Sequence, residues 1–369
     1  MKTLILKRPV IAVAGSSGKT TTKEMIASIL KRRWRIYKSA KNRTNRDHIR
    51  IHRRRIKPSH RAVVLEYSMS YRGHLRRSCQ IIQPNMAIVT MVGTAHIGNL
   101  GGSLEALIKA KSGIIQHMKP TGTLLLNADD ANSQRLDFGR FRGRVIKVGI
   151  KKPADYQASR IDYGQRGMNF SVSLAGQTYR FFIPVFGEHN VYNALFAIAA
   201  ADQLGFRPAQ IDKGLRSFRR PPHRLRVYRL KRGVRLLDDT FNANPHSVKA
   251  ALDVLSRVGK EHRVAVLGNM SELGRYSERG HREVGEYLAG HEISQLLTYG
   301  KKARQIGTAA VAAGLPVRNV QHSPTRARLH RSLRGAIKHG TTILVKGSHD
   351  QHMVRTVRFL RRAGGIAPQ

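Results

Sequence analysis

The segment from Val10 to Arg33 constrains the fold of this chain more than any other. Five apolar residues, Val10–Ala14, run directly into a Gly/Ser-rich turn that ends in Gly18-Lys19-Thr20, and a helical pattern follows over Lys23–Arg33. A strand, a tight turn and a helix N-terminus direct backbone N–H groups to one place, where the helix dipole also favours negative charge. This order of elements predicts an α/β domain with a phosphate-binding loop.

Each residue type in this loop has a chemical role in binding phosphate or Mg²⁺. Gly18 lets the backbone approach a phosphate closely, Lys19 reaches the β- and γ-phosphates, and the Thr20 hydroxyl is a Mg²⁺ ligand. Val13 stands where the general template has its first glycine, so a turn that merely caps a helix stays open as the alternative. We predict an ATP or GTP site. The residues expected around the phosphates are Gly15, Ser16, Ser17, Gly18, Lys19, Thr20 and Thr21.

Short apolar runs alternate with amphipathic stretches of helical length along nearly the whole chain, which predicts α/β layers around mostly parallel sheets. Alternating runs around Gly176-Gln177 predict a β-hairpin, and Pro221-Pro222 marks the best linker. We predict a central phosphate-loop ATPase domain over residues 1–219 and a Rossmann-like doubly wound domain over residues 220–369. The expected strands are Val10–Ala14, Ala62–Glu66, Met86–Thr90, Gly122–Asn127, Val234–Asp238, Val264–Leu267, Gln295–Thr298 and Thr341–Val345.

Charge is the most unusual property of the composition. The 369 residues include 67 Lys and Arg against 22 Asp and Glu, which gives a formal charge of +45, and 41% of the residues are hydrophobic. The apolar fraction excludes a disordered chain, and the charge favours a polyanionic partner. Between Lys31 and Arg61, fourteen basic residues accompany one acid, Asp47, with Trp34 and Tyr37 as aromatics of the kind that stack on bases. This segment is a candidate polyanion contact, with a solvated charged face as the alternative.

Cysteine content and hydropathy bear on the compartment. Cys79 is the single cysteine, so an intrachain disulfide is excluded. No apolar run reaches the roughly 18 residues that a transmembrane helix needs. We therefore expect a cytoplasmic protein with no transmembrane segment.

Polar residues that follow apolar strands indicate where chemistry takes place. Glu66 ends an apolar strand, where a phosphate-loop fold carries a metal-binding acid. His96, the run Asn127–Asp130 and the pair Asp238-Asp239 follow other expected strands. Because ligands of open α/β sheets bind beyond the carboxyl ends of the strands, these groups are expected to converge. Taken singly, each also fits an ordinary turn or helix cap.

A series of motifs then follows one order over nearly the whole chain. They are Gly15–Thr22, Val64–Tyr67, Val89–His96, Ala110-Lys111, Leu126–Asp130, Phe186–Asn190 with Asn193, His223–Leu225, Asp238–Pro245, Val266–Gly274 and Val345–Ser348. In this order they resemble the Mur ligase family, and within it the branch that adds D-alanyl-D-alanine in peptidoglycan biosynthesis for the cell wall. The resemblance implies an ATP-dependent, ADP-forming ligase. ATP phosphorylates a substrate carboxylate, and the amine of an amino acid or dipeptide attacks the acyl phosphate.

The resemblance also implies roles for single residues. Lys19, Lys111 and His96 would be catalytic, with Thr20 and Glu66 at one Mg²⁺ and His96 at a second. Lys111 matches a lysine that is carbamylated in many members. The expected nucleotide contacts beyond the loop are Asn190, Asn193, Arg224 and Asp239, and the expected contacts to the incoming amine are Asn242 and Asn244.

The chain departs from the family pattern in several places. The phosphate loop begins at Gly15, so we expect the N-terminal UDP-binding domain to be lacking. Gly113, Asn269 and His349 stand where Glu, Asp and Arg are common in the family. Two other hypotheses therefore stay open: a polyanion-binding phosphate-loop protein with little or no ligase activity, and an inactive partner protein. If the chain is a ligase, Lys31–Arg61 would offer charge to an acidic acceptor.

Overall fold

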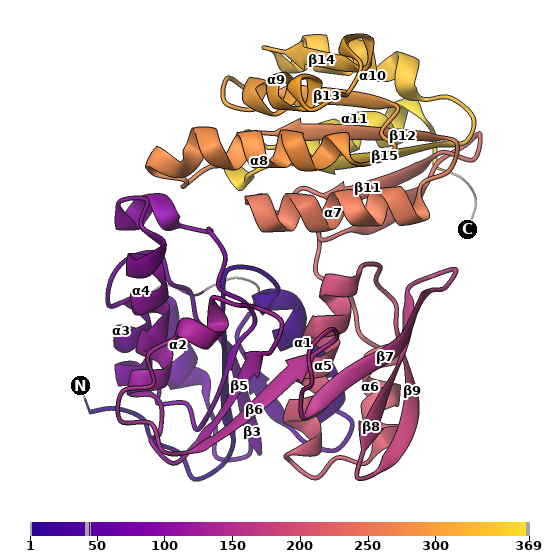
Figure 1. Ribbon diagram of the computed structural model, residues 1–369. Helices are drawn as coiled ribbons and strands as arrows, with labels where there is room; N and C mark the ends of the chain where they lie inside the picture. Colours follow the sequence, from indigo (N-terminus) through magenta and orange to yellow (C-terminus); the bar gives the residue numbers. More distant parts are fainter. Residues whose placement is uncertain (1, 41–43, 45, 367–369) are drawn as a thin grey trace. The chain divides into compact units, whose positions relative to one another are not determined.

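The computed structural model describes residues 2–40, 44 and 46–366, and its contacts divide the chain into two units, Met1–Pro221 and Pro222–Gln369. The division predicted from the sequence lies slightly earlier, between Arg219 and Arg220. Both units are α/β with mostly parallel sheets, as predicted (Figure 1). None of the helices in the described part of the chain is long and apolar enough to cross a membrane.

The first unit contains a nine-stranded sheet in which all neighbours are parallel except at one edge, where β8 pairs antiparallel with both β7 and β9. β1 lies inside the sheet between β3 and β4, and the strand order reverses direction there. In spatial order the strands are β2 (Ile36–Lys38), β3 (Ala62–Glu66), β1 (Val10–Ala14), β4 (Met86–Val89), β5 (Thr123–Asn127), β6 (Arg144–Gly149), β7 (Tyr156–Tyr163), β8 (Met168–Leu174) and β9 (Gln177–Ile183).

Two local predictions for this unit need adjustment. The hairpin turn is Ala175-Gly176, one residue before the predicted pair, because these two residues have the positive φ angles, 47° and 80°, that a tight hairpin needs. The first helix begins at Lys19 and not at Lys23, since the threonines of the loop already form its first turn. The helices are α1 (Lys19–Leu30), α2 (Arg46–Arg55), α3 (His74–Ile81), α4 (Leu104–His117), α5 (Glu188–Asp202) and α6 (Pro208–Arg216), with short 3-10 helices η1 (Ile97–Leu100) and η2 (Ser133–Arg135).

The second unit is a doubly wound domain built on a six-stranded sheet. β15 lies between β11 and β12, so the strand order reverses beside it, and only the edge strand β10 is antiparallel. In spatial order the strands are β10 (Arg226–Arg229), β11 (Arg235–Asp239), β15 (Thr341–Lys346), β12 (His262–Gly268), β13 (Gln295–Tyr299) and β14 (Val320–Ser323). The helices are α7 (Pro245–Val258), α8 (Ser277–Ala289), α9 (Arg304–Ala312), α10 (Arg326–Ala336) and α11 (Val354–Ala363), with η3 (Gly274–Tyr276), η4 (Val317–Asn319) and η5 (His349–Gln351).

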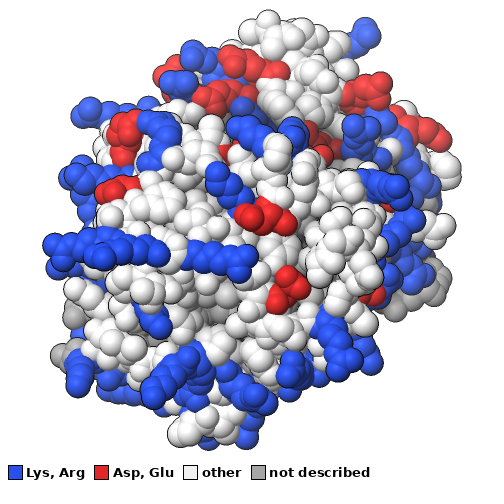
Figure 2. Space-filling model, turned by 60° about the horizontal axis from the view of Figure 1, so that its bottom comes forward, with Lys and Arg blue, Asp and Glu red and all other residues white. Residues whose placement is uncertain are grey.

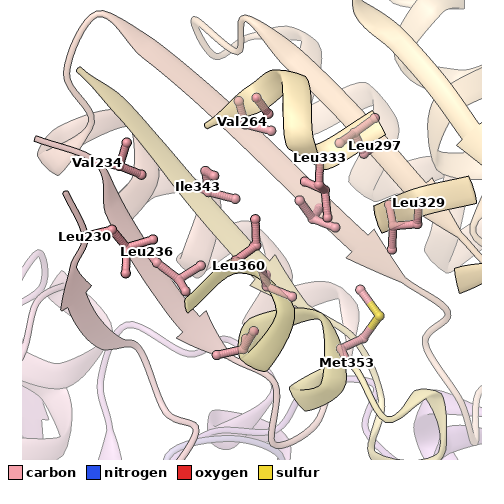
Figure 3. Packing of buried hydrophobic residues seen from close by; sticks show 14 residues of the cluster. Leu230, Val234, Leu236, Val264, Leu297, Leu329, Leu333, Ile343, Met353 and Leu360 are labelled. Carbon is pink, nitrogen blue, oxygen red and sulfur yellow. The ribbon is translucent and has the colours of Figure 1, made fainter. Parts of the chain in front are cut away.

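Helices cover both faces of this second sheet. On one face, leucines of α10 and α11 pack against alternate residues of β11, β12, β13 and β15, as Figure 3 shows for Leu333, Leu360 and Ile343. α7, α8 and α9 cover the other face (Figure 1). Folds of this kind bind ligands beyond the carboxyl ends of the central strands.

Candidate active site

The phosphate loop begins at the carboxyl end of β1, beside the ends of two neighbouring strands. Val13 is paired with Glu66 of β3, and Ala14 with Val89 of β4. All five residues of β1 are buried, because helices pack on both faces of the sheet. The parallel register therefore brings the loop, the Glu66 carboxylate and the loop after β4 to one edge of the sheet.

Two glycines allow the loop to be packed tightly. At Gly15 (φ 136°) an added Cβ would lie 2.1 Å from Thr90 Oγ1, and at Gly18 (φ 83°) it would lie 2.3 Å from Asn193 Oδ1. Both conformations are left-handed, where a side chain is strained. Glycine is thus required at both places by backbone geometry and by close neighbours.

Side chains fasten the loop to the strand beside it. The Ser16 hydroxyl donates to Gly93 O at 2.8 Å and accepts from Gly93 N at 2.9 Å. Thr90 Oγ1 donates to Ser17 O at 2.5 Å, and Lys19 Nζ donates to Gly15 O at 2.8 Å, so the lysine lies over its own loop. These hydrogen bonds connect the loop to the strand beside it and place the Lys19 ammonium over the loop.

The first turn of α1 and helix α5 meet at the predicted asparagines. Asn193 Oδ1 accepts from Thr22 Oγ1 at 3.0 Å, and Asn193 Nδ2 donates to Asn190 Oδ1 at 2.9 Å. Asn190 Nδ2 in turn donates to Phe186 O at 2.7 Å. Thr20 and Thr21 are both buried in the same first turn. The structure therefore brings the two asparagines to the loop itself.

Glu66 is buried beside a lysine to which the sequence analysis assigned no role. Lys23 Nζ lies 3.8 Å from Glu66 Oε2 and 3.2 Å from Glu24 Oε1, and it donates to Ser39 O at 3.0 Å. The Ser39 hydroxyl accepts from Glu66 N at 3.1 Å. Among the described residues, Glu66 Oε2 accepts no hydrogen bond. One oxygen of a buried carboxylate is thus available to a ligand at the strand end.

Lys111 is the most unusual group of the first unit. Its side chain is 1% exposed on α4, and Nζ has no hydrogen-bond partner in the part of the chain that the structure describes. Burial, reinforced by the Lys19 ammonium and opposed by Asp130, lowers the pKa of Lys111 to about 7. At neutral pH a large share of its amine is uncharged, and an uncharged amine is a nucleophile.

His96 and Asp130 belong to the loops that flank this site. His96 precedes η1 with φ 63°, an uncommon conformation for a residue with a side chain. Asp130 Oδ2 accepts from Val92 N at 2.6 Å and from Ser133 Oγ at 2.5 Å. Asp129 instead accepts from Tyr192 OH at 2.7 Å and from three backbone N–H groups. The two aspartates therefore position loops.

The second unit has its own group of charged residues at a strand end. Lys346 on β15 is paired with Asp239 on β11, and its Nζ donates to Asp239 Oδ2 at 2.5 Å and to Asn242 O at 2.8 Å. Asp238, fully buried, accepts from Thr240 Oγ1 at 2.7 Å and lies 2.8 Å from His223 Nδ1. These side chains hold the segments 223–225 and 240–244 against the sheet.

The predicted substrate and nucleotide residues of this unit lie around that group. Arg224 stacks over Phe241, with Cζ 4.0 Å from the ring centroid. Asn244 caps α7, and its Oδ1 accepts from Ser247 N at 3.0 Å. The Asn242 side chain accepts from Ala243 N at 2.9 Å. Asn269, one of the departures from the family pattern, accepts from Ala303 N through Oδ1 at 2.8 Å.

The basic segment Lys31–Arg61 begins just after α1 and contains β2 and α2, and residues 41–43 and 45 in it lie outside the described part of the chain. Its aromatic side chains have partners within the protein. Trp34 packs edge-on against Phe206 at 4.9 Å, and Tyr37 OH is 2.7 Å from His52 Nδ1. Basic side chains lie around much of the face shown in Figure 2, and mostly uncharged residues occupy its middle. The segment offers charge, while its aromatics are used in packing.

Sequence reasoning missed Lys23 and Thr90 as parts of this site. Lys23 directly follows the threonines of the loop, and Thr90 ends the run Met86–Thr90 that was predicted as a strand. The position of Lys23, one turn into the helix that follows the phosphate loop, was the sequence signal that could have indicated its part in the site. Its partners could not be predicted from the sequence, because Ser39 and Glu66 approach it only in the folded sheet.

The fold and these strand ends define a class: a two-unit α/β nucleotide-binding protein with a phosphate loop and a Rossmann-like second unit. The family patterns agree. The Mur ligase middle domain matches residues 13–201, and the Mur ligase glutamate ligase domain matches residues 223–349. The chain belongs to the Mur ligase family, whose members are ATP-dependent ligases that form amide bonds.

Individual relatives point to one branch. UDP-N-acetylmuramoyl-tripeptide–D-alanyl-D-alanine ligase of Bacillus subtilis is 31% identical over 95% of this chain and 75% of its own. The Escherichia coli enzyme of the same name is 32% identical over 96% and 77%. A crystal structure of MurF from Acinetobacter baumannii superposes with a TM-score of 0.88 at 29% identity, covering 96% of this chain and 76% of that one. The resemblance inferred from the motifs is confirmed.

Proposed function

We propose that the chain joins D-alanyl-D-alanine to the terminal carboxylate of a UDP-linked muramoyl tripeptide, in the cytoplasm, with ATP converted to ADP. The match to enzymes of that name over nearly the whole chain carries the proposal. The phosphate loop and Glu66 lie at the same sheet edge, and among the described residues the buried Lys111 amine has no hydrogen-bond partner.

The residues present fit Mg²⁺. Carboxylate and hydroxyl oxygens are the ligands that this ion prefers, and Glu66 and Thr20 supply them at the carboxyl end of β3 and the start of α1. No group of three or more acidic, histidine or cysteine residues in the described ranges could hold a metal by itself. Phosphate oxygens of ATP and water would therefore complete its coordination. When bound, Mg²⁺ neutralises charge on the phosphates. We propose that His96 is a ligand of a second Mg²⁺.

The Lys111 environment fits carbamylation. The amine is buried, has no partner among the described residues, and has a pKa of about 7, so the uncharged form that attacks CO₂ is present at neutral pH. Carbamylation forms an N–C bond, releases a proton and replaces a cation by an anion. We propose that this anion faces the second Mg²⁺.

The proposed reaction has two chemical steps, and residues of the chain position the reactants for them. Backbone N–H groups of residues 15–21 and the Lys19 ammonium hold the β- and γ-phosphates in line with the substrate carboxylate. A carboxylate oxygen attacks the γ-phosphorus and ADP leaves. The dipeptide amine attacks the acyl carbon, and phosphate leaves as the amide forms. Because little covalent help is needed, positioning and charge neutralisation supply most of the catalysis.

The remaining predicted contacts are part of the proposal. Asn190 and Asn193 contact the nucleotide from α5, and Arg224 and Asp239 contact ATP from the second unit. Asn242 and Asn244 line the site of the incoming amine. The basic segment Lys31–Arg61 provides the charge that attracts an acidic acceptor, which is the polyanion contact expected from the sequence.

The test is phosphate release by the purified chain with ATP, Mg²⁺, UDP-linked muramoyl tripeptide and D-alanyl-D-alanine. Phosphate is expected only when acceptor and dipeptide are both present, and mass spectrometry should find the joined product. Lys19→Ala is expected to lower the rate by about a hundredfold or more, because it removes a charge aimed at the transferring phosphoryl group. No turnover with this pair, or undiminished turnover in Lys19→Ala, would refute the proposal.

A further inference from the structure

Helices α10 and α11 of the second unit each bury one side and expose another that carries basic residues and no acidic one. Leu329 and Leu333 of α10 and Val357 and Leu360 of α11 lie in the core on one face of the sheet (Figure 3). Neither helix contains an acidic residue. The exposed basic side chains on these helices and just after α10 are Arg328, Arg331, Arg334, Lys338, Arg355, Arg358 and Arg362.

The two helices form one continuous surface. His330 of α10 stacks on Phe359 of α11, with ring centroids 4.2 Å apart and planes 7° apart. His330 Nε2 also lies 3.2 Å from Thr356 Oγ1 of α11. These contacts fix the helices side by side, so the basic residues of both belong to the same face of the unit.

The opposite face of the same sheet differs in how its charges are arranged. On α8, Arg279 pairs with Glu283 at 3.1 Å and Arg282 with Glu286 at 3.5 Å. Within the described ranges, no carboxylate lies within ion-pair distance of the seven basic residues on the α10 and α11 face. Clustered like charges repel one another, and an anionic partner relieves that repulsion.

We infer that the outer face of α10 and α11 docks on an anionic phospholipid bilayer. Clusters of about four to eight Lys and Arg on amphipathic helices are typical of anionic lipid contacts, and this face has that number. Arginine, which dominates here, binds phosphate with a paired set of donors. Ile366, 53% exposed just after α11, adds an apolar side chain at the edge of the face.

A nucleic acid fits this face less well. Proteins that bind single strands without sequence preference use exposed aromatic rings on which bases stack. Here Phe359 is covered by His330, and Tyr228 lies under Arg361 at 4.4 Å and Arg226 at 5.0 Å. The face therefore offers charge over a broad surface without rings for stacking, as a bilayer requires.

The test uses the full chain and sedimentation with vesicles of phosphatidylcholine alone or mixed with phosphatidylglycerol. Binding is expected only to the mixed vesicles and should fall steeply with salt. The triple variant R328E/R331E/R358E is expected to bind at least about tenfold more weakly, because each basic residue near an anionic surface contributes measurably. K151E/K152E/R166E makes the same change in net charge with exposed residues of the first unit, and is expected to bind nearly as the wild type does.

Three outcomes would contradict the inference. Equal losses in both triple variants would show that net charge alone drives binding. Undiminished binding by R328E/R331E/R358E would show that another surface docks. Displacement from the vesicles by a DNA duplex at equal phosphate concentration would show that nucleic acid is the preferred partner. Unchanged thermal unfolding and phosphate release in R328E/R331E/R358E separate this surface from the ligase site.

Discussion

The carboxyl ends of the two sheets carry similar side chains but use them differently. In the first unit, Lys111 Nζ and Glu66 Oε2 are buried without a hydrogen-bond partner among the described residues. In the second unit, Lys346 donates to the Asp239 carboxylate and to Asn242 O, and Asp238 accepts from the Thr240 hydroxyl. An unsatisfied buried polar group costs about 1–3 kcal/mol, so a fold retains one mainly where a ligand later pairs with it. The first edge therefore keeps buried groups open to ligands, whereas the second pairs its charged groups with one another and so positions the segments that carry the proposed substrate contacts.

The largest expected effect tests the first half of this comparison. Lys111→Met should lower the rate of phosphate release by about a hundredfold to a thousandfold, because it removes the carbamate that is proposed to face the second Mg²⁺. It should not lower the free energy of unfolding, since the amine makes no bond there. Urea denaturation followed by fluorescence of Trp34 measures the second quantity.

Lys23→Met is the matched control, because Lys23 is equally buried in the same unit but is paired with Glu24, Glu66 and Ser39. Its loss should reduce the free energy of unfolding by about 3 kcal/mol, as for other broken buried pairs. Equal stability losses in the two variants would show that Lys111 has a structural partner after all.

The second unit should respond in the opposite way. Lys346→Met leaves Asp239 without its main partner and is expected to cost about 3 kcal/mol of stability, measured by urea denaturation. The double variant Lys346→Met/Asp239→Asn should recover part of that loss, because the uncompensated charge is gone. A double variant no more stable than the single one would mean that the pair is not the source of the effect.

The pH dependence of the unfolding free energy tests the comparison at Lys111. The pKa of Lys111 falls from its ordinary 10.5 to about 7, so between these values the unfolded chain binds more protons than the folded one. Unfolding free energy should therefore rise with pH from about 7 to about 10 in the wild type, and this contribution should be absent in Lys111→Met.

The same titration should be visible in the rate. With a pKa of about 7, roughly half of the amine is uncharged at pH 7 and roughly a tenth at pH 6, so phosphate release is expected to fall about fivefold between these pH values if carbamylation limits it. Added bicarbonate should restore part of the rate at the lower pH. A rate that ignores bicarbonate at every pH would exclude the carbamate.

The smallest effect concerns Asn244, which caps α7 and is also proposed to contact the amine substrate. Asn244→Ala should cost about 1 kcal/mol of stability, whereas Asn244→Ser should keep the cap. If Asn244 also binds the dipeptide, both variants should raise its KM. An unchanged KM in Asn244→Ser would show that Asn244 caps α7 and does not bind the dipeptide.

Most of the fold could be predicted because buried parallel strands are short uninterrupted apolar runs, as in Val10–Ala14 and Ala62–Glu66. The strands that were missed are partly exposed. β2 is only three residues long, and Lys147 interrupts the apolar run of β6. Partial burial weakens the apolar pattern of such a strand, so the strand cannot be distinguished from a loop by its sequence.

The order of motifs, the phosphate loop and the strand-end positions of Glu66 and Asp239 were determined by the sequence alone, because neighbouring parallel strands end at one edge. Only the tertiary structure decided which charged groups are paired. Lys23 and Lys111 are the same residue type at similar burial, yet Lys23 is paired with Glu66, whereas Lys111 Nζ has no hydrogen-bond partner among the described residues. That difference depends on which distant segments pack against each helix, and local sequence patterns do not encode such contacts.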